Sequence, residues 1–162
     1  MMPDFKALIE QLTEDEGYRQ DVYECTNGFP TVGIGFALKD LKPKISADLA
    51  LEIIHWQIDN NLIHLSLEHS QFILTTECPE LHFQLSERFS FYDDLPQMVQ
   101  NVLLNMAFQI GTYGLSKFKK MLKAMEKADW KEASIEMLDS KWARRDSPAR
   151  ANRLADIVRE HG

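Results

Sequence analysis

The sequence predicts an α+β fold, in which a small antiparallel β-sheet combines with a mainly helical region. Near the start of the chain, apolar residues recur at helical spacing. Residues 18–38 break that period and are rich in Tyr, Val, Thr, Ile and Phe between turn-forming residues. Beyond residue 97 the apolar positions return to the helical period in several segments. A chain of 162 residues, 44% of them hydrophobic, can bury one core, so a single domain is expected.

The first predicted element is a short helix over residues 4–15, followed by a small sheet with tight turns over residues 18–38. Within that sheet, Gly33 and Gly35 are expected to permit close backbone approach by a ligand or by another strand. They do not form a phosphate-binding loop, because no helix with a lysine follows at the right distance.

The middle of the chain is predicted to contain one long helix. Ser46 is a typical N-cap, and residues 47–65 carry apolar residues at helical spacing, so this helix would connect two lobes. Residues 66–95 show no clear pattern, and Pro79 and Pro96 are expected to mark element boundaries.

The C-terminal part is predicted to be helical. One apolar face extends over residues 99–110 and is expected to stop at Gly111. A second helix carries the apolar positions between Phe118 and Met125, and Asp129 is expected to cap a third. Ser147 and Pro148 start the last helix, since proline is favoured at the first helical position.

The net charge of −7 conceals an uneven distribution along the chain. Residues 1–95 hold 17 acidic and 6 basic side chains, whereas residues 96–162 hold 8 and 12. The basic half is suited either to binding an anionic polymer or to forming a solvated helix surface, and both interpretations stay open. Nucleic acid is a poor candidate partner, because the acidic half repels phosphate and no recognition motif is present. The basic residues concerned are Lys117, Lys119, Lys120, Lys123, Arg144, Arg145, Arg150 and Arg153.

The sequence shows neither an export signal nor a pattern of cysteines typical of disulfide-bonded proteins. No run approaches about 18 consecutive apolar residues, so no transmembrane helix is predicted. The N-terminus lacks the basic start and apolar run of a secretory signal, so we expect synthesis in the cytoplasm and delivery by another route. Cys25 and Cys78 are too few for a disulfide scaffold, and both are expected to be reduced, with Cys78 buried as a small hydrophobe.

The residues that are the best candidates for catalysis lie between Asp15 and Gly35. Glu16 follows an amphipathic helix, where a carboxylate meets the negative end of the helix dipole and costs stability unless it has a partner or a function. A glutamate there is a candidate general acid for glycosidic-bond cleavage, although taken alone it is more often part of a solvated turn. The Thr31 hydroxyl can hold a water or a sugar hydroxyl. Cys25 can act as a nucleophile, bind water or pack.

Two other chemistries are disfavoured. A cysteine–histidine hydrolase needs a partner histidine, and none of the five histidines lies in a recognisable local signature. No set of His, Cys, Asp and Glu has metal-ligand spacing, so neither a metal nor another cofactor is predicted.

These residues resemble the phage-type lysozymes, a glycoside hydrolase family of endolysins and muramidases. The match covers about residues 5–58 and 95–160, and it keeps the order of the family's motifs. Residues 60–94 resemble no pattern that we can name. The motifs that carry the resemblance are Glu16-Gly17 with the hairpin from Tyr23 to Thr31 and its closing Thr-x-Gly-x-Gly, then Leu95-Pro96 with the run to Gly111, Gly114 and Phe118, and finally Ser140 to Leu154.

The resemblance implies a mainly helical, lysozyme-like fold formed by one domain over residues 1–162. A small antiparallel sheet lobe of about residues 13–58 would be joined by the long helix to a helical lobe of about residues 59–162, which packs with helix 4–12. The implied reaction is hydrolysis of the β-1,4 bond between N-acetylmuramic acid and N-acetylglucosamine in peptidoglycan.

The resemblance also assigns roles to residues. Glu16 is similar to the catalytic acid, and Thr31 to the threonine that holds the attacking water. Cys25 occupies a position that is aspartate in the T-even-phage branch and cysteine in a branch resembling lambdoid-prophage endolysins. A neutral thiol cannot stabilise an oxocarbenium-like charge as a carboxylate does, whereas a thiolate could, or the thiol could place water. The substrate-binding residues that it implies are Asn105, Phe108, Gln109, Met121 and Arg150.

Alternatives accompany these assignments. Phe108 and Met121 are equally suited to core packing, and Arg150 can pair with Glu16 or form a surface ion pair. An active muramidase is expected, the alternative being a module that binds glycan without cutting it. The expected binding partner is the glycan strand of peptidoglycan. The protein is expected to be a monomer and not to insert into membranes. Either a phage endolysin released by a holin or an effector delivered by a secretion machine fits, and an effector implies an immunity protein that docks at residues 60–94.

Overall fold

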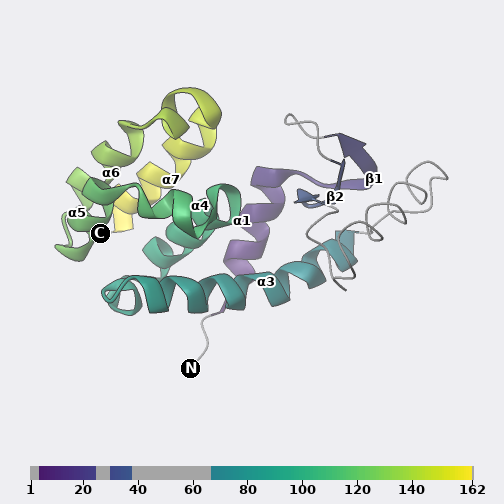
Figure 1. The fold of residues 1–162 in the computed structure, drawn as a ribbon, viewed down its shortest axis with the longest axis horizontal. Helices are drawn as coiled ribbons and strands as arrows, with labels where there is room; N and C mark the ends of the chain where they lie inside the picture. Colours follow the sequence, from purple (N-terminus) through teal and green to yellow (C-terminus); the bar gives the residue numbers. More distant parts are fainter. Residues whose placement is uncertain (1–3, 25–29, 38–66, 162) are drawn as a thin grey trace. The chain divides into compact units, whose positions relative to one another are not determined.

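The computed structural model describes residues 4–24, 30–37 and 67–161 (Figure 1). Cys25 and the predicted helix 47–65 therefore lie outside the described residues. The contacts divide the chain into two compact units, one of residues 1–8 and 77–162 and the other of residues 9–76. The described residues are mostly helical with little strand, which confirms the mainly helical character that the sequence predicts.

The unit of residues 9–76 contains a small antiparallel sheet. Its strands are β1 (Arg19–Glu24), β2 (Pro30–Gly33) and β3 (Phe36–Ala37), and they lie in the order β1-β2-β3. Thr31 occupies the central strand, where it is paired with Tyr23 of β1 and with Ala37 of β3. The turn between β2 and β3 is built on glycine. Gly33 and Gly35 have φ values of +68° and +69°, a conformation that most other residues avoid.

Helix α1 (Lys6–Glu16) enters this unit and stops just before the sheet. It begins and ends within one or two residues of the predicted helix 4–15, and its apolar side is buried through Leu8 and Leu12. The helix ends because Gly17 adopts φ +72°, which turns the chain while the Gly17 N–H still donates to the Thr13 carbonyl at 3.1 Å. This is a glycine C-cap of the left-handed type, and it places Glu16 on the last helical turn.

Helix α3 (Leu67–Arg88) corrects one expectation. The prediction that Pro79 marks a boundary is wrong, because Pro79 lies inside this helix. Proline removes one backbone hydrogen bond and crowds the preceding turn, which costs roughly 3 kcal/mol in a helix interior. The helix continues because Leu74, Cys78 and Leu85 are all fully buried, so side-chain burial on both sides of the proline outweighs the local penalty.

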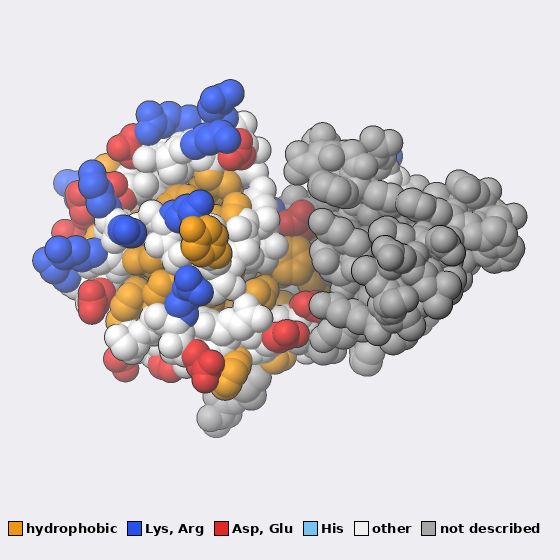
Figure 2. Space-filling model, viewed as in Figure 1, with side chains coloured by type: hydrophobic (Ala, Val, Ile, Leu, Met, Phe, Trp, Pro, Cys, Tyr) orange, Lys and Arg blue, Asp and Glu red, His pale blue; other side chains and the backbone are white. Residues whose placement is uncertain are grey.

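The remaining elements belong to the unit of residues 77–162 and confirm the predicted C-terminal helices. Helix α7 packs against α4, α6 and the π-helical turn η3, and α5 packs against α6. Figure 2 shows lysine and arginine side chains over the surface of this helical group. The elements are η2 (Tyr92–Asp94), α4 (Gln97–Ser116), α5 (Lys119–Glu126), α6 (Trp130–Leu138), η3 (Trp142–Asp146) and α7 (Pro148–His161).

Local signals set the ends of these helices. Pro96 directly precedes α4, as predicted, and the Asp129 side chain accepts a hydrogen bond from the Glu132 N–H at 3.0 Å as the N-cap of α6. Gly111 interrupts α4 with φ +76° and ψ 161°, but helical turns resume beyond it and reach Ser116. The predicted stop is therefore a break within α4 rather than its end.

A buried amide ties the start of α4 to the 3₁₀ turn η2. Gln100 is 7% exposed, and its Nε2 donates to the main-chain carbonyls of Tyr92 at 3.1 Å and Leu95 at 3.3 Å. The Tyr92 carbonyl also accepts from the Leu95 N–H at 3.1 Å, so the Leu95 carbonyl is the group for which the Gln100 donor matters most.

Candidate active site

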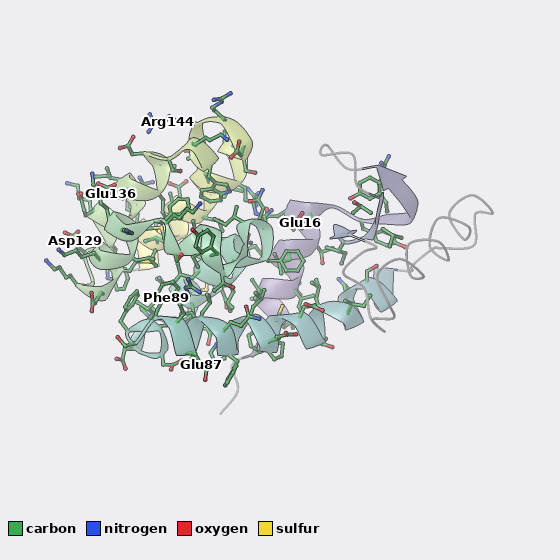
Figure 3. All side chains as sticks on the ribbon, viewed as in Figure 1. Glu16, Glu87, Phe89, Asp129, Glu136 and Arg144 are labelled. Atoms are coloured by element: carbon green, nitrogen blue, oxygen red, sulfur yellow. The ribbon has the colours of Figure 1, made fainter. Side chains whose placement is uncertain are left out.

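Glu16 is the last residue of α1, and Figure 3 shows it at the point where the helix gives way to the connection into β1. Its side chain is half-buried, whereas Gly17 beside it is exposed. The left-handed conformation of Gly17 fixes the direction in which the chain leaves the helix. Glu16 is thus held on a rigid element, at a helix end where its carboxylate is electrostatically disfavoured.

The Gly35 backbone packs directly against the Glu16 side chain. A Cβ placed on Gly35 would lie 3.0 Å from Glu16 Oε2, 3.3 Å from its Cβ and 3.5 Å from its Cδ. Only a residue without a side chain allows the β2–β3 turn to come this close to the carboxyl group. The expected close approach at Gly35 is therefore real, but its neighbour is an acidic side chain from a helix rather than a strand.

Thr31 lies in the same unit, on the central strand of the sheet. It is only 4% exposed, and its backbone is paired with a neighbouring strand on both sides, so its side chain is held in place by the central position of its strand. The structure thus places two of the three predicted catalytic residues, Glu16 and Thr31, in one unit. Cys25, the third, lies outside the described residues.

A second group of predicted site residues is centred on Asn105 and Arg150. Asn105 on α4 is fully buried, and Arg150 on α7 is 6% exposed. Arg150 Nε donates to Asn105 Oδ1 at 2.8 Å, and its Nη2 reaches the Asn105 main-chain oxygen at 3.5 Å. A buried guanidinium needs such acceptors, so the pair ties α7 to α4.

Gln109 is exposed, but both ends of its amide are engaged. Its Oε1 accepts a hydrogen bond from the Trp142 indole N–H at 2.8 Å, and its Nε2 donates to Ser147 Oγ at 2.6 Å. The Trp142 ring in turn meets the Phe118 ring edge-on, with centroids 6.1 Å apart. No local sequence pattern indicates this arrangement, since its members lie up to 38 positions apart.

The two remaining substrate-binding candidates differ in burial. Phe108 is half-buried, whereas Met121 is 1% exposed and packs in the core, as the alternative interpretation expected. Glu16 and Arg150 belong to different units, so their pairing stays a prediction, as do the substrate-binding roles of all five residues.

Two general properties bear on the chemistry of the site. Across the described residues there is no group of three or more His, Cys, Asp or Glu side chains placed to hold a metal ion. None of the helices in the described ranges has the length and apolar character needed to span a bilayer.

Comparisons with known proteins identify the family of the chain. The phage lysozyme family matches residues 13–156. Two probable T4-type lysozymes of Dictyostelium discoideum, numbered 2 and 1, are each 30% identical to this chain. The alignment with lysozyme 2 covers 93% of this chain and 92% of that protein. The alignment with lysozyme 1 covers 94% of this chain and 93% of that protein. The pre-baseplate central spike protein Gp5 of Enterobacteria phage T4 is 28% identical over 94% of this chain but only 27% of its own length. With a family match over most of its residues, the chain belongs to the phage lysozyme family.

Proposed function

We propose that this chain is a muramidase that hydrolyses the β-1,4 bond between N-acetylmuramic acid and N-acetylglucosamine in peptidoglycan, with Glu16 as the general acid. Membership of the phage lysozyme family supports the reaction class. The observation that carries the assignment of Glu16 is its contact with Gly35 at the end of α1. A carboxyl group used as a proton donor must keep one position through the reaction, and packing against a glycine backbone provides that.

In this proposal Glu16 donates its proton to the glycosidic oxygen as the bond to the sugar breaks, and the departing sugar leaves as an alcohol. Thr31 orients the water that attacks the resulting oxocarbenium-like centre. That water releases a proton to bulk solvent as the new C–O bond forms, and the Glu16 carboxylate takes up a proton from solvent, so atoms and charge balance over the hydrolysis. Because the position of the usual second carboxylate is Cys25, the reaction depends more heavily on the single acid and the placement of water.

The substrate would be held by residues of the helical unit. Asn105, Phe108, Gln109, Met121 and Arg150 are proposed as its contacts or their direct supports, as the resemblance implies. Gln109 is the member whose geometry most favours direct contact, since it is exposed and its amide is oriented by two hydrogen bonds. The whole chain would then act as one domain of two lobes, with the cell wall as its site of action.

Digestion of purified peptidoglycan tests the proposal. We expect the parent protein to release muropeptides with reducing N-acetylmuramic acid ends, detected by mass spectrometry. Glu16→Gln should release none. Glu14→Gln is the matched control, because Glu14 is an exposed glutamate on the same helix and its replacement removes the same charge.

Each outcome has a distinct meaning. Products from Glu16→Gln at the parent's rate would exclude Glu16 as the acid. Glycan binding without products from the parent would favour the binding module, and Cys25→Asp would then test whether a second carboxylate restores turnover.

A further inference from the structure

The solvent-facing side of α5 is almost entirely lysine. At 3.6 residues per turn, about 100° separates successive residues, and the exposed positions of this helix fall within one arc of about 120°. The opposite side carries the buried residues Met121, Leu122, Ala124 and Met125. Glu126 lies at one edge of the exposed arc. The rest of the arc, together with the C-cap residue Lys127 directly after the helix, is the lysine strip, which we define as Lys119, Lys120, Lys123 and Lys127.

This arrangement works against the stability of the helix. Lys119 and Lys123 are four residues apart, as are Lys123 and Lys127, and like charges at this spacing repel one another. Lys119 and Lys120 also occupy the first turn, where the helix dipole favours acidic residues, and α5 has no acidic residue there. Lys123 lies in the last turn, where the dipole favours a cation, so the cost falls on the first turn and on the spacing of the lysines.

Neighbouring acids relieve little of this repulsion. Lys120 approaches Glu136 of α6 at 3.9 Å, but its side chain is 81% exposed, so water screens the pair. Within the described part of the chain, the other three lysines of the strip have no ion-pair partner. The strip therefore presents a concentrated positive charge to solvent, on a chain whose net charge is −7.

We propose that the lysine strip docks the enzyme onto an anionic wall polymer whose repeating units are joined by phosphodiesters. The inference rests on the proposed function, which places the protein's substrate in the cell wall. Bound phosphates would offset the lysine–lysine repulsion and the unfavourable helix dipole together. The strip would also overcome the general repulsion that an acidic chain experiences near such a polymer.

The chemistry of the strip favours this polymer over other anionic partners. All four cations are lysines, which bind phosphate as flexible point charges and so suit groups that move along a polymer, whereas a fixed bidentate site for phosphate or carboxylate favours the planar fork of arginine. The exposed arc carries no apolar side chain, so it has nothing to insert into a bilayer, as membrane-surface helices do. A flexible polyanion with regularly repeated charges matches a row of mobile ammonium groups about one helical turn apart.

Wall binding measured without digestion tests the proposal. The Glu16→Gln protein is sedimented with isolated walls that retain their phosphodiester polymer, and with the same walls after acid has removed it. Lys119→Ala/Lys123→Ala in this background should lower affinity for the intact walls about 25-fold, since each lysine near an anionic surface contributes a factor of about five. Lys131→Ala/Lys141→Ala removes the same charge from exposed positions outside the strip and should change affinity by less than about threefold.

A second variant separates docking from folding. Lys119→Glu should raise the melting temperature by about 1–4 °C, because it relieves repulsion and places an acid in the first turn. The same change should weaken binding to intact walls. A lysine kept for structural reasons would not show opposite effects on stability and on binding.

Several results would overturn the proposal. The first is that the strip variant and the control variant bind intact walls with the same affinity. The second is that the strip variant loses as much affinity for walls without the polymer as for intact walls. The third is that the parent protein binds anionic lipid vesicles as tightly as it binds walls. Cleavage of a soluble wall oligosaccharide should be unchanged in both lysine variants made with Glu16 intact. Loss of that cleavage in the parent would overturn the proposed function, while the binding comparison would still decide the docking proposal.

Discussion

Replacing Gly35 by alanine should disturb the candidate acid without touching it chemically. The new Cβ would lie 3.0 Å from Glu16 Oε2 and 3.3 Å from Glu16 Cβ, whereas ordinary contacts begin near 3.4 Å. The carboxyl group must therefore withdraw by about 0.4 Å, or the β2–β3 turn must move by a similar distance.

The expected magnitudes follow from this displacement. A misplacement of about 1 Å costs roughly 100-fold in rate, so a shift of about 0.4 Å, scaled on the free energy, lowers kcat about sixfold. Alanine at φ +69° adds strain of about 1–2 kcal/mol to the folded state. We therefore expect Gly35→Ala to lose both stability and turnover.

Alanine variants at two other glycines are controls that separate the effect of backbone strain from the effect of displacing Glu16. Gly17 and Gly111 have φ values of +72° and +76°, and an added Cβ at either has nothing within 4 Å. Gly17→Ala should therefore lose about 1–2 kcal/mol in urea unfolding, and Gly111→Ala, whose ψ of 161° lies in a region essentially confined to glycine, about 1–3 kcal/mol. Gly111→Ala should keep the parent's kcat on soluble wall oligosaccharides at a temperature where every variant is folded.

The decisive comparison is kcat for Gly35→Ala against Gly111→Ala. If the two variants turn over at rates within twofold of each other, the contact between Gly35 and Glu16 does not position the acid. If the stability loss at Gly35 is similar to that of the controls but kcat falls about sixfold, the contact with Gly35 positions the acid.

Two further predictions concern buried groups of the helical unit. Gln100→Leu removes the side-chain donor to the Leu95 carbonyl and should cost about 1–3 kcal/mol in urea unfolding. The control Gln84→Leu, whose bond with Thr112 is exposed, should cost less than about 0.5 kcal/mol. A loss no larger than that of the control would contradict the role of this hydrogen bond. The second prediction concerns the Cys78 thiol, whose pKa is raised from 9.0 to about 12 by burial and by the nearby Glu77. Between pH 9 and 12 the thiol therefore loses its proton in the unfolded chain but keeps it in the folded protein. Stability should fall as pH rises from 9 toward 12, and Cys78→Ala should make this fall shallower by up to about 1.4 kcal/mol per pH unit, which equal slopes would disprove.

The parts of the fold that the sequence predicted are those governed by local chemistry. Asp129 caps α6 through a bond to a residue three positions away, and Pro148 begins α7 because its fixed φ suits a first helical turn. The prediction that Pro79 marks a helix boundary is wrong for the complementary reason. Its local preference is to end a helix, but Leu74 and Leu85 are buried on either side of it, and burial depends on residues far away in the chain.

The candidate site also contains features that the sequence predicted and features that it did not. The acidic residue and the Gly-x-Gly pattern indicated Glu16 and a close approach at Gly35, but a glycine signals only that space is needed. That the approaching group is Glu16 itself depends on how the sheet folds back to the helix end. The engagement of Gln109 by Trp142 and Ser147 involves separations of 33 and 38 residues, for which a single sequence carries no periodic or motif signal.

The two hydrogen bonds on Gln109 fix more than the position of its side chain. A carboxamide carries two N–H groups and two acceptor lone pairs, and here Ser147 takes one N–H while Trp142 fills one lone pair. One N–H and one lone pair remain, with their directions already set. An N-acetyl group, present on both sugars of a peptidoglycan strand, offers one carbonyl and one N–H in return. A sugar that reached Gln109 would meet a complementary amide whose rotational entropy had already been lost on folding, and would gain affinity without the usual cost of ordering a surface side chain.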